Sequence, residues 1–405
     1  MKLIEIILNQ MTTVCKPQKK FLLKAFQAFL SVGGRLNFSN MCRYIGLSEK
    51  TFARQFAKSF NFSLFNCKTI EAIIGCKNKN LAMAFDPFFI PKAGDKTHGK
   101  GMFWSGCNGK AKEGLEASLL SIIDLNKRTG YAFHACQTPN SDELKKIESM
   151  PVGATRIDSY LQHIVSEVPS FPSEVKCLLV DAQFYNEKFV TGVCDTGLHI
   201  VSRMRKDANI LSLYCGLQKK RGRHKKYDGN INFEKLNEIF IKDNPAVTLK
   251  STIAYSVALK RNIRIVLVKK TSADGKSKEA ILFSTDVEMQ PIDIYLHYTA
   301  RFQIEFVIRD AKQHTGLTHC QSRKKDIIDF HINMSFAAVN FAKFEEHERL
   351  GANADDMPCS IGNQRIRYHN EMLIQSIFPM FGLDILEFKS HPAYERALSY
   401  GAIYF

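Results

Sequence analysis

One short stretch of the chain carries an acid, two cations and a phenol at helical intervals. The four residues are Tyr298, Arg301, Glu305 and Lys312, which lie 0, 3, 7 and 14 positions from the first of them. At about 100° per residue of an α-helix, these side chains fall within an arc of roughly 60°. A carboxylate flanked by cations on one rigid edge suits a metal ion and a phosphate backbone, so we expect this edge to belong to a site and not to a core.

Two further acids end apolar segments that we expect to be buried strands. Asp86 ends a run that begins at Leu81, and Asp181 ends a run that begins at Val175. If these strands lie side by side, their acids come close together, and a helix behind them adds Glu305. Clustered carboxylates need neutralising cations, and hard oxygen ligands select Mg²⁺ or Mn²⁺. The three acids therefore predict two divalent ions that activate a water or 3′-hydroxyl and stabilise the leaving oxygen of a phosphodiester.

Three other acids compete for these roles. Asp124 also ends a predicted strand, but that strand points it away from the other two acids. Asp286 precedes the Glu305 helix and remains open as an outer residue of the site or a helix N-cap. Asp95 lies in a Gly- and Lys-rich loop and is a weaker rival of Asp86. Three histidines flank the Glu305 helix, and we expect surface or core positions for them, with DNA contact or proton transfer as the alternative: His297, His314 and His319.

The remaining elements that must position these residues form a mixed α/β framework. Strands are predicted over 81–86, 117–125, 130–137, 175–181 and 199–205. Helices are predicted over 155–168, about 186–194, about 292–313 and about 326–346. The helix over 292–313 carries the edge from Tyr298 to Lys312.

Residues 1–78 are predicted to form a helical N-terminal domain. Within it, about 38–58 has the organisation of a helix-turn-helix, with a turn at Gly46 and Ser48 as N-cap of the second helix. In DNA readers this second helix enters the major groove. Helical hairpins with a glycine turn also occur as plain packing units, so both interpretations stay open. The side chains that the second helix would expose are Lys50, Thr51, Arg54 and Gln55, of which Arg54 is the candidate DNA contact.

The chain is strongly basic, with a net charge of +16 over 405 residues. Such an excess favours a polyanionic partner, nucleic acid first and an anionic membrane surface second. Between Arg203 and Lys226 nine Lys or Arg accompany one acid, Asp207. We interpret 206–285 as a β-rich insertion with a basic loop. Four of its cations are predicted to contact nucleic acid: Arg221, Arg223, Lys225 and Lys226.

Several other classes of protein are disfavoured. Polar residues interrupt the apolar runs, which are too short to span a bilayer, and the N-terminus lacks the layout of a signal peptide. We therefore expect a cytoplasmic protein with no membrane partner and no nucleotide cofactor. The 11 cysteines form no C-x-x-C pair, since the closest two, Cys67 and Cys76, are nine positions apart. This spacing indicates scattered reduced thiols and not a structural zinc site.

The spacing of Tyr298, Arg301, Glu305 and Lys312 resembles the Tyr-x2-Arg-x3-Glu-x6-Lys signature of bacterial insertion-sequence transposases with an Asp-Asp-Glu active site. The resemblance covers about 80–345. It implies an α/β, ribonuclease H-like mixed-sheet catalytic core, formed by 79–205 and 286–345, with 346–405 as a C-terminal region. It also implies roles for six residues: Asp86, Asp181 and Glu305 would be catalytic and bind two Mg²⁺ or Mn²⁺ ions, and Tyr298, Arg301 and Lys312 would contact phosphates near the transposon end.

The resemblance further implies partners and a reaction. Such a protein binds the terminal inverted repeats of its element, cleaves the strand at each end and joins the 3′-hydroxyls to target DNA. Double-stranded DNA is therefore the implied partner, a homodimer would bring two ends together, and the protein would associate with the bacterial nucleoid when bound to DNA. In relatives the inserted β region holds the DNA end, sometimes through an aromatic residue on a flipped base. The only tryptophan, Trp104, lies outside the insertion, and we expect it to pack beside the first strand, which leaves Tyr214, Tyr227 or another residue for such a grip.

Two other functions stay open. The first is a non-catalytic DNA-binding protein, either a decayed transposase or a regulator. All three acids and all four signature positions are intact, which argues against decay. The second is a ribonuclease H-like nuclease, which would need neither the basic insertion nor the reader-like N-terminus.

Overall fold

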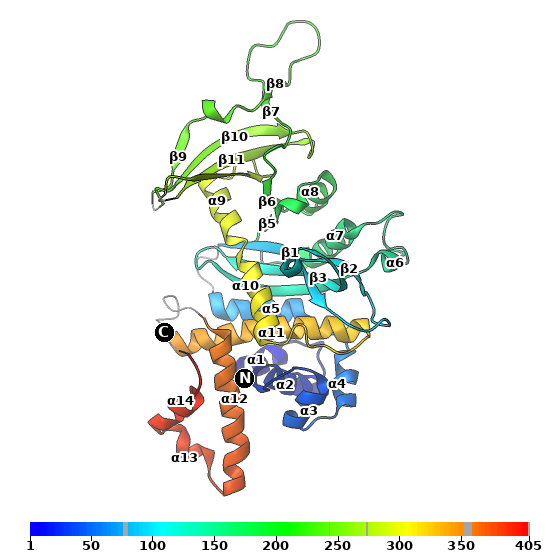
Figure 1. Cartoon of the computed structure of the whole chain (residues 1–405), viewed down its shortest axis with the longest axis vertical. Coiled ribbons are helices and arrows are strands. Elements are labelled where there is room, and N and C mark those ends of the chain that lie inside the picture. The colour runs from blue at the N-terminus through cyan, green and yellow to red at the C-terminus, as the bar shows by residue number, and fades with distance from the viewer. Residues whose placement is uncertain (76–79, 243, 273, 352–358, 404–405) are drawn as a thin grey trace.

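The computed structural model describes residues 1–75, 80–242, 244–272, 274–351 and 359–403. Its centre is a mixed sheet in the order β2-β3-β1-β5-β6-β12-β11-β10-β7-β8, with β4 on β3 and β9 on β10 (Figure 1). The first part of the sheet comprises β1 (Leu81–Pro91), β2 (Gly101–Ser105), β3 (Lys110–Asp124), β4 (Thr129–Thr138), β5 (Cys177–Leu179) and β6 (His199–Met204). The second part comprises β7 (Ile210–Leu213), β8 (Tyr227–Asn230), β9 (Glu238–Phe240), β10 (Val247–Ser256), β11 (Arg261–Thr271) and β12 (Ser277–Ser284).

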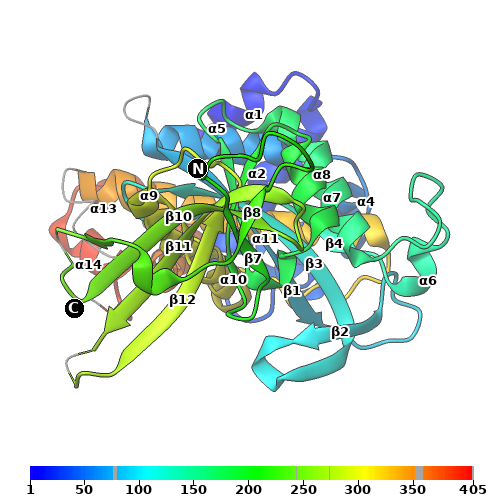
Figure 2. The ribbon, with the colours of Figure 1, turned by 90° about the horizontal axis from the view of Figure 1, so that it is seen from above.

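The predicted β-rich insertion continues the sheet of the predicted core. Strand β12 pairs antiparallel with β6, and β11 and β10 follow in antiparallel order. Figure 2 shows β10–β12 extending on one side of the molecule and β2 on the other. The sheet therefore connects the basic region to the strands that carry Asp86 and Asp181. The predicted division of the chain into a core and an insertion stays a prediction.

Helices cover both faces of the first part of the sheet. One face packs against α9 (Pro291–Ala300), α10 (Gln303–His314) and α11 (Lys325–Leu350), and the other against α7 (Arg156–Glu167) and α8 (Glu187–Cys194). Side chains alternate between the faces along β1, because successive residues of a strand point in opposite directions. Ala82 and Ala84 accordingly join the core under α10 and α11, while Met83 and Phe85 join the core under α7 and α8.

The N-terminal helices pack against the same core as α11. They are α1 (Lys2–Gln10), α2 (Lys16–Ser31), α3 (Phe38–Ile45), α4 (Glu49–Phe56) and α5 (Phe62–Ile74). Phe56 of α4 lies 4.4 Å from Phe330 of α11, measured between ring centroids. The boundary predicted between residues 78 and 79 lies outside the described residues.

Helices α3 and α4 form the predicted helix-turn-helix. Gly46 ends α3 in the left-handed conformation, with φ of 69°, and the Ser48 hydroxyl accepts a hydrogen bond from Thr51 N at 3.2 Å. Arg54 is exposed as predicted. Gln55 is not exposed as predicted, because its side chain turns toward the core and is only 7% accessible.

The free edge of β4 is covered by side chains of α11. Asn333 accepts a hydrogen bond from Ala135 N at 2.9 Å and donates one to Ala135 O at 2.8 Å. Asn340, two helical turns later, forms the same pair of bonds with Ala132, at 3.0 and 2.7 Å. Two amides thus replace a neighbouring strand and satisfy backbone groups that would otherwise be buried without partners.

The C-terminal region consists of α12 (Ile361–Ile377), α13 (Ile385–Lys389) and α14 (Pro392–Leu398). Arg365 of α12 donates to the carbonyl oxygens of Leu30, at 3.2 Å, and of Val32, at the end of α2. It thereby satisfies carbonyl groups that a helix end leaves unpaired. None of the helices that the structure describes is long and apolar enough to cross a bilayer.

Candidate active site

Asp86 and Asp181 lie on neighbouring parallel strands. In the ladder between β1 and β5, Met83 pairs with Leu178 and Ala84 with Leu179. Each aspartate therefore lies two residues beyond the last paired position of its strand. The prediction that Asp86 ends its strand is wrong, because β1 continues along β3 to Pro91. Within this ladder Asp86 lies opposite Leu119. Asp181 follows β5 and caps a short 3₁₀ turn, accepting from Ala182 N at 2.7 Å.

The predicted helix over 292–313 is two helices. Helix α9 ends at Ala300 and α10 begins at Gln303. At the junction, Ile304 N donates to Arg301 O at 3.1 Å and Glu305 N to Phe302 O at 3.0 Å. These bonds span three residues, so they tighten the turn and interrupt regular α-helix.

The junction divides the signature residues between two helices but keeps three of them in contact. Arg301 is buried, and its Nη2 donates to Glu305 Oε1 at 2.9 Å. The same guanidinium lies 5.9 Å from the centroid of the Tyr298 ring. Burial raises the pKa of Tyr298, and the charge of Asp181 raises it further. The end of α9 therefore faces the aspartate that follows β5.

Asp86 is surrounded by the charges of this site. Its carboxylate is partly buried, and no described residue donates a hydrogen bond to it. Burial raises the pKa of Asp86 to about 7; Arg301 and Lys312 oppose the rise, while Glu305 and Asp181 add to it. These mutual effects place three acids and two cations in one small region, so the structure brings the predicted acids together with Tyr298, Arg301 and Lys312.

The oxygen donors of the three acids suit a hard divalent ion, but they do not converge as they stand. Within the described ranges, no three His, Cys, Asp or Glu side chains are arranged to hold a metal ion. Glu305 accepts a hydrogen bond from Arg301, and Asp181 accepts one from the backbone N–H of Ala182. Arg301 thus supplies a positive charge to a cluster of acids that otherwise repel one another.

The competing acids have structural roles. Asp124 is buried and accepts from Asn126 N at 2.9 Å and Lys127 N at 3.1 Å, which stabilises the turn between β3 and β4. It lies opposite Leu81, on the face away from Asp86. Asp286 accepts from Glu288 N at 2.9 Å and is not a helix N-cap, because Gln290 occupies that position of α9. Asp95 pairs with Lys100 at 3.1 Å.

The other predicted DNA contacts lie away from the acids. Arg221, Arg223, Lys225 and Lys226 belong to the exposed loop between β7 and β8, at the top of Figure 1 and at the far end of the strand order from β1. In this loop, Lys225 Nζ lies 4.7 Å from the centroid of the Tyr214 ring. Arg54 lies on α4, among the N-terminal helices.

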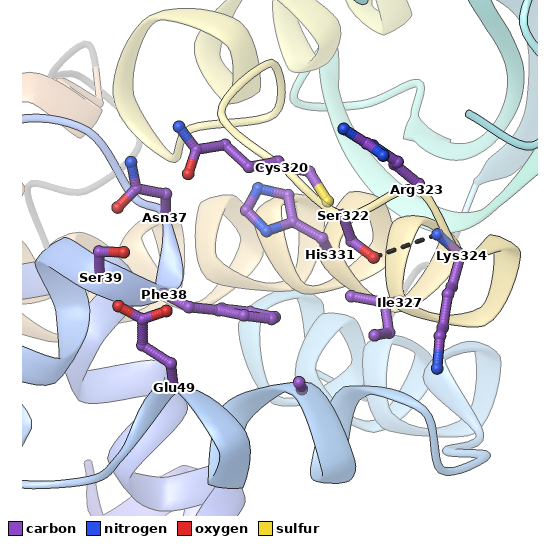
Figure 3. A pocket seen from close by; sticks show the side chains of 12 residues that line it. Asn37, Phe38, Ser39, Glu49, Cys320, Ser322, Arg323, Lys324, Ile327 and His331 are labelled. Atoms are coloured by element: carbon purple, nitrogen blue, oxygen red, sulfur yellow. Dashed lines mark hydrogen bonds between the residues drawn. The ribbon is translucent and has the colours of Figure 1, made fainter. Parts of the chain in front are cut away.

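A cavity of about 450 Å³ separates the helix-turn-helix from the loop that precedes α11 (Figure 3). Phe38 and Glu49 line it from α3 and α4, and Cys320, Arg323 and His331 line it from the opposite side. None of the three candidate acids lines this cavity, so it is separate from the site around Asp86.

Sequence reasoning missed the hairpin formed by β2 and β3. Burial lowers the pKa of Lys312, and Cys107, in the turn of the hairpin, opposes that effect together with Asp86. The turn therefore reaches the candidate site. Its sequence signal is Gly109, which has φ of 59° after a short apolar strand.

Comparison with known proteins identifies a family for this chain. A search of curated proteins finds no match to the chain. A protein family described as the transposase DDE domain matches residues 78–341, more than half of the sequence. This range contains all three candidate acids and all four signature residues. The chain belongs to the transposase DDE domain family.

Proposed function

We propose that this transposase binds the terminal inverted repeats of an insertion sequence and catalyses metal-dependent strand cleavage and strand transfer. The observation that carries the proposal is that Asp86 and Asp181 lie two residues beyond the last pair of a parallel ladder, where the charge of Glu305 is near enough to raise the pKa of Asp86. A pair of parallel strands and a helix supply these acids, which supports a ribonuclease H-like core. Double-stranded DNA would be the substrate, and two copies of the chain would bring two ends together.

The three acids would hold two Mg²⁺ or Mn²⁺ ions. When bound, such ions activate a water or 3′-hydroxyl and stabilise the leaving oxygen. Glu305 would then exchange its bond with Arg301 for an ion. The released guanidinium, together with Lys312 and the Tyr298 hydroxyl, would bind phosphate oxygens of the strand at the site.

Residues outside the acid cluster would hold the rest of the DNA. The loop with Arg221, Arg223, Lys225 and Lys226 is exposed and offers cations without competing acids nearby, apart from Asp228, which pairs with Lys225 at 2.6 Å. Arg54 on α4 would reach the duplex through the helix-turn-helix. These contacts would position the DNA, and the acids would act on it.

Glu305→Gln tests the assignment with DNA that carries the flanking sequences of the gene. We expect the variant to bind these ends like the wild type and to lose Mg²⁺-dependent nicking and strand transfer by at least about 100-fold, since Gln cannot supply a charged ligand. Glu288→Gln is the matched control, because Glu288 is exposed in the turn before α9. Full nicking by the Glu305 variant would contradict the assignment. DNA binding without metal-dependent cleavage by the wild type would favour a non-catalytic DNA-binding protein, and cleavage of any RNA–DNA hybrid would favour a nuclease.

A further inference from the structure

An apolar patch on the hairpin of β2 and β3 is open to solvent. Trp104 is 60% exposed and Met102 is 61% exposed. The prediction that Trp104 packs beside the first strand is wrong, because β2 pairs with the outer part of β3 and leaves this side chain uncovered. A single exposed apolar side chain is ordinary, whereas adjacent ones bordered by polar residues mark interaction sites.

The strand register places this patch on the face of the sheet that carries Asp86. Trp104 lies opposite Ala111 of β3, and Leu119, eight residues further along β3, lies opposite Asp86 of β1. Opposed residues of antiparallel strands share a face, and so do residues separated by an even number along one strand. Trp104 and Asp86 therefore lie on the same face.

Packing on the other face supports this orientation. Phe103, between Met102 and Trp104, is 3% exposed. The guanidinium of Arg156, from α7, lies 5.7 Å from the centroid of its ring. Helix α7 belongs to the face opposite α10, so the two neighbours of Phe103 point to the side of Asp86.

The patch adjoins the cation at the end of the signature. Lys312 Nζ lies 5.8 Å from the centroid of the Phe88 ring, and Phe88 is two residues beyond Asp86 on the same face. The turn that follows Trp104 lies close enough to Lys312 for Cys107, in this turn, to raise the pKa of Lys312. Exposed Lys110 lies directly after this turn. The acid on this face of the hairpin, Glu113, is paired with Lys100 at 3.0 Å.

We propose that Trp104, with Met102 beside it, stacks on an unpaired nucleobase of the DNA strand whose phosphate lies at Lys312. The inference rests on the proposed function, because it assumes that a DNA strand lies over the Asp86 face. An aromatic surface bordered by cations matches the chemistry of single-stranded DNA, whose bases expose π-faces and whose phosphates seek positive charge. Trp104 is thus a positioning residue that holds the strand opened beside the acids.

Trp104 is the only tryptophan of the chain, so its fluorescence reports on the patch alone. We would titrate the full-length protein, in EDTA, with a twelve-nucleotide oligothymidine and with an abasic oligomer of the same length and charge. We expect quenching by oligothymidine and little quenching by the abasic strand. Trp104→Ala should weaken oligothymidine binding by between about 5-fold and 100-fold, a range set by the stacking of one base, and should leave abasic binding unchanged.

Two variants and a folding measurement complete the design. Trp104→Phe should retain most of the affinity because it keeps an aromatic face. Tyr400→Ala removes an aromatic side chain that is 83% exposed near the C-terminus and should change neither affinity. Circular dichroism and thermal unfolding establish that each variant is folded.

Equal quenching by both oligomers, or equal loss of affinity for both in Trp104→Ala, would overturn the proposal. So would a change of Trp104 fluorescence with protein concentration alone, because the patch would then be a contact between copies. These readouts need no metal and no cleavage. A failure of the proposed catalytic function would appear only in the Mg²⁺-dependent nicking assay.

Discussion

Asp86 and Asp181 occupy equivalent positions on two parallel strands, each two residues beyond the last pair of the ladder, Ala84 and Leu179. This relationship makes their proximity a consequence of backbone pairing and not of flexible side chains. The carboxylates are close enough to raise the pKa of Asp86, and burial contributes the larger part of that rise, to about 7.

The pKa of Asp86 predicts how metal affinity depends on pH. If Asp86 holds an ion as proposed, the ion must displace the proton of Asp86 when this group is protonated. Below about 7, the affinity for Mn²⁺ should therefore fall by up to about tenfold for each pH unit, and it should level off above this value. Isothermal titration at pH 6, 7 and 8 measures this dependence. Asp86→Asn should bind weakly at every pH, and a wild-type affinity that is constant over the range would contradict the prediction.

Arg301 is predicted to neutralise the three acids in the metal-free protein, as a bound metal ion would. Arg301→Met removes a buried cation from a cluster of three acids and should lower the free energy of unfolding by about 1–3 kcal/mol in EDTA, because Glu305, its hydrogen-bond partner, is partly exposed to solvent. Excess Mn²⁺ should restore part of this loss, because the ion neutralises the same acids. Urea unfolding with and without Mn²⁺ measures both effects.

Arg309→Met is the matched control for Arg301. Arg309 pairs with Asp310 at 3.1 Å but is half exposed, so its removal should cost less than about 1 kcal/mol and should show no dependence on Mn²⁺. An equal loss of stability in the two variants, or a loss in Arg301→Met that Mn²⁺ does not change, would argue against the role of Arg301.

Local patterns in the sequence predicted the features that depend on neighbouring residues. The helix-turn-helix followed from Gly46 and Ser48, and the proximity of the acids followed from two apolar runs in the right order. The length of β1 depended on tertiary pairing: Pro87 suggests a strand end, yet the strand continues because only the edge toward β3 is paired beyond Ala84. The break at Arg301 had no sequence signal, since neither Gly nor Pro marks it.

Exposure was the other property that the sequence left open. An apolar side chain such as Trp104 is buried only if another element covers its face of the sheet. Whether α10 extends over β2 depends on tertiary packing, and no local sequence pattern predicts it. Gln55 is the reverse case, because a polar residue on an amphipathic helix lies toward the core. Sequence periodicity locates a helix more reliably than it identifies the width of its buried face.

The basic loop is predicted to contribute to DNA affinity through charge alone. Replacing Arg221, Arg223, Lys225 and Lys226 together by Gln should reduce the slope of log affinity against log salt concentration by about 3.6, since each neutralised phosphate contributes about 0.9. Fluorescence anisotropy over a salt series measures the slope. Lys145→Gln combined with Lys146→Gln, both exposed near α6 (Ser141–Leu144), should leave it unchanged. An unaltered slope in the fourfold variant would show that the loop does not contact DNA.

Asn340 is predicted to be essential for stability because it pairs with the backbone of an edge strand. Asn340→Leu would leave the N–H and carbonyl of Ala132 buried without partners, and it should lower the free energy of unfolding by about 2–4 kcal/mol. Hydrogen exchange of the Ala132 amide should accelerate while that of Ala135, which Asn333 protects, changes less. Asn9→Leu, at an exposed position of α1, is a control expected to cost less. Unchanged exchange at Ala132 would show that the edge has another partner.

His331 is predicted to make stability depend on pH between about 4 and 6.5. The side chain is buried in the wall of the cavity in Figure 3, and its ring contacts Gly316 O at 2.8 Å. Burial lowers its pKa to about 4. Because the folded-state pKa lies below the unfolded value, the unfolded chain binds the proton first as the pH falls. The stability that depends on neutral His331 is therefore complete above about 6.5 and is lost as the pH falls toward about 4, by up to about 3 kcal/mol.

His331→Gln separates this contribution from that of other groups. At pH 7 the variant should be less stable than the wild type, because it loses the ring packing and its bond to Gly316. As the pH falls, the wild type should lose stability faster, since only its side chain at this position binds a proton on unfolding. The difference between the two proteins, measured by urea unfolding at pH 7, 6, 5 and 4.5, should therefore shrink. A difference that stays constant over this range would show that His331 is not the group responsible.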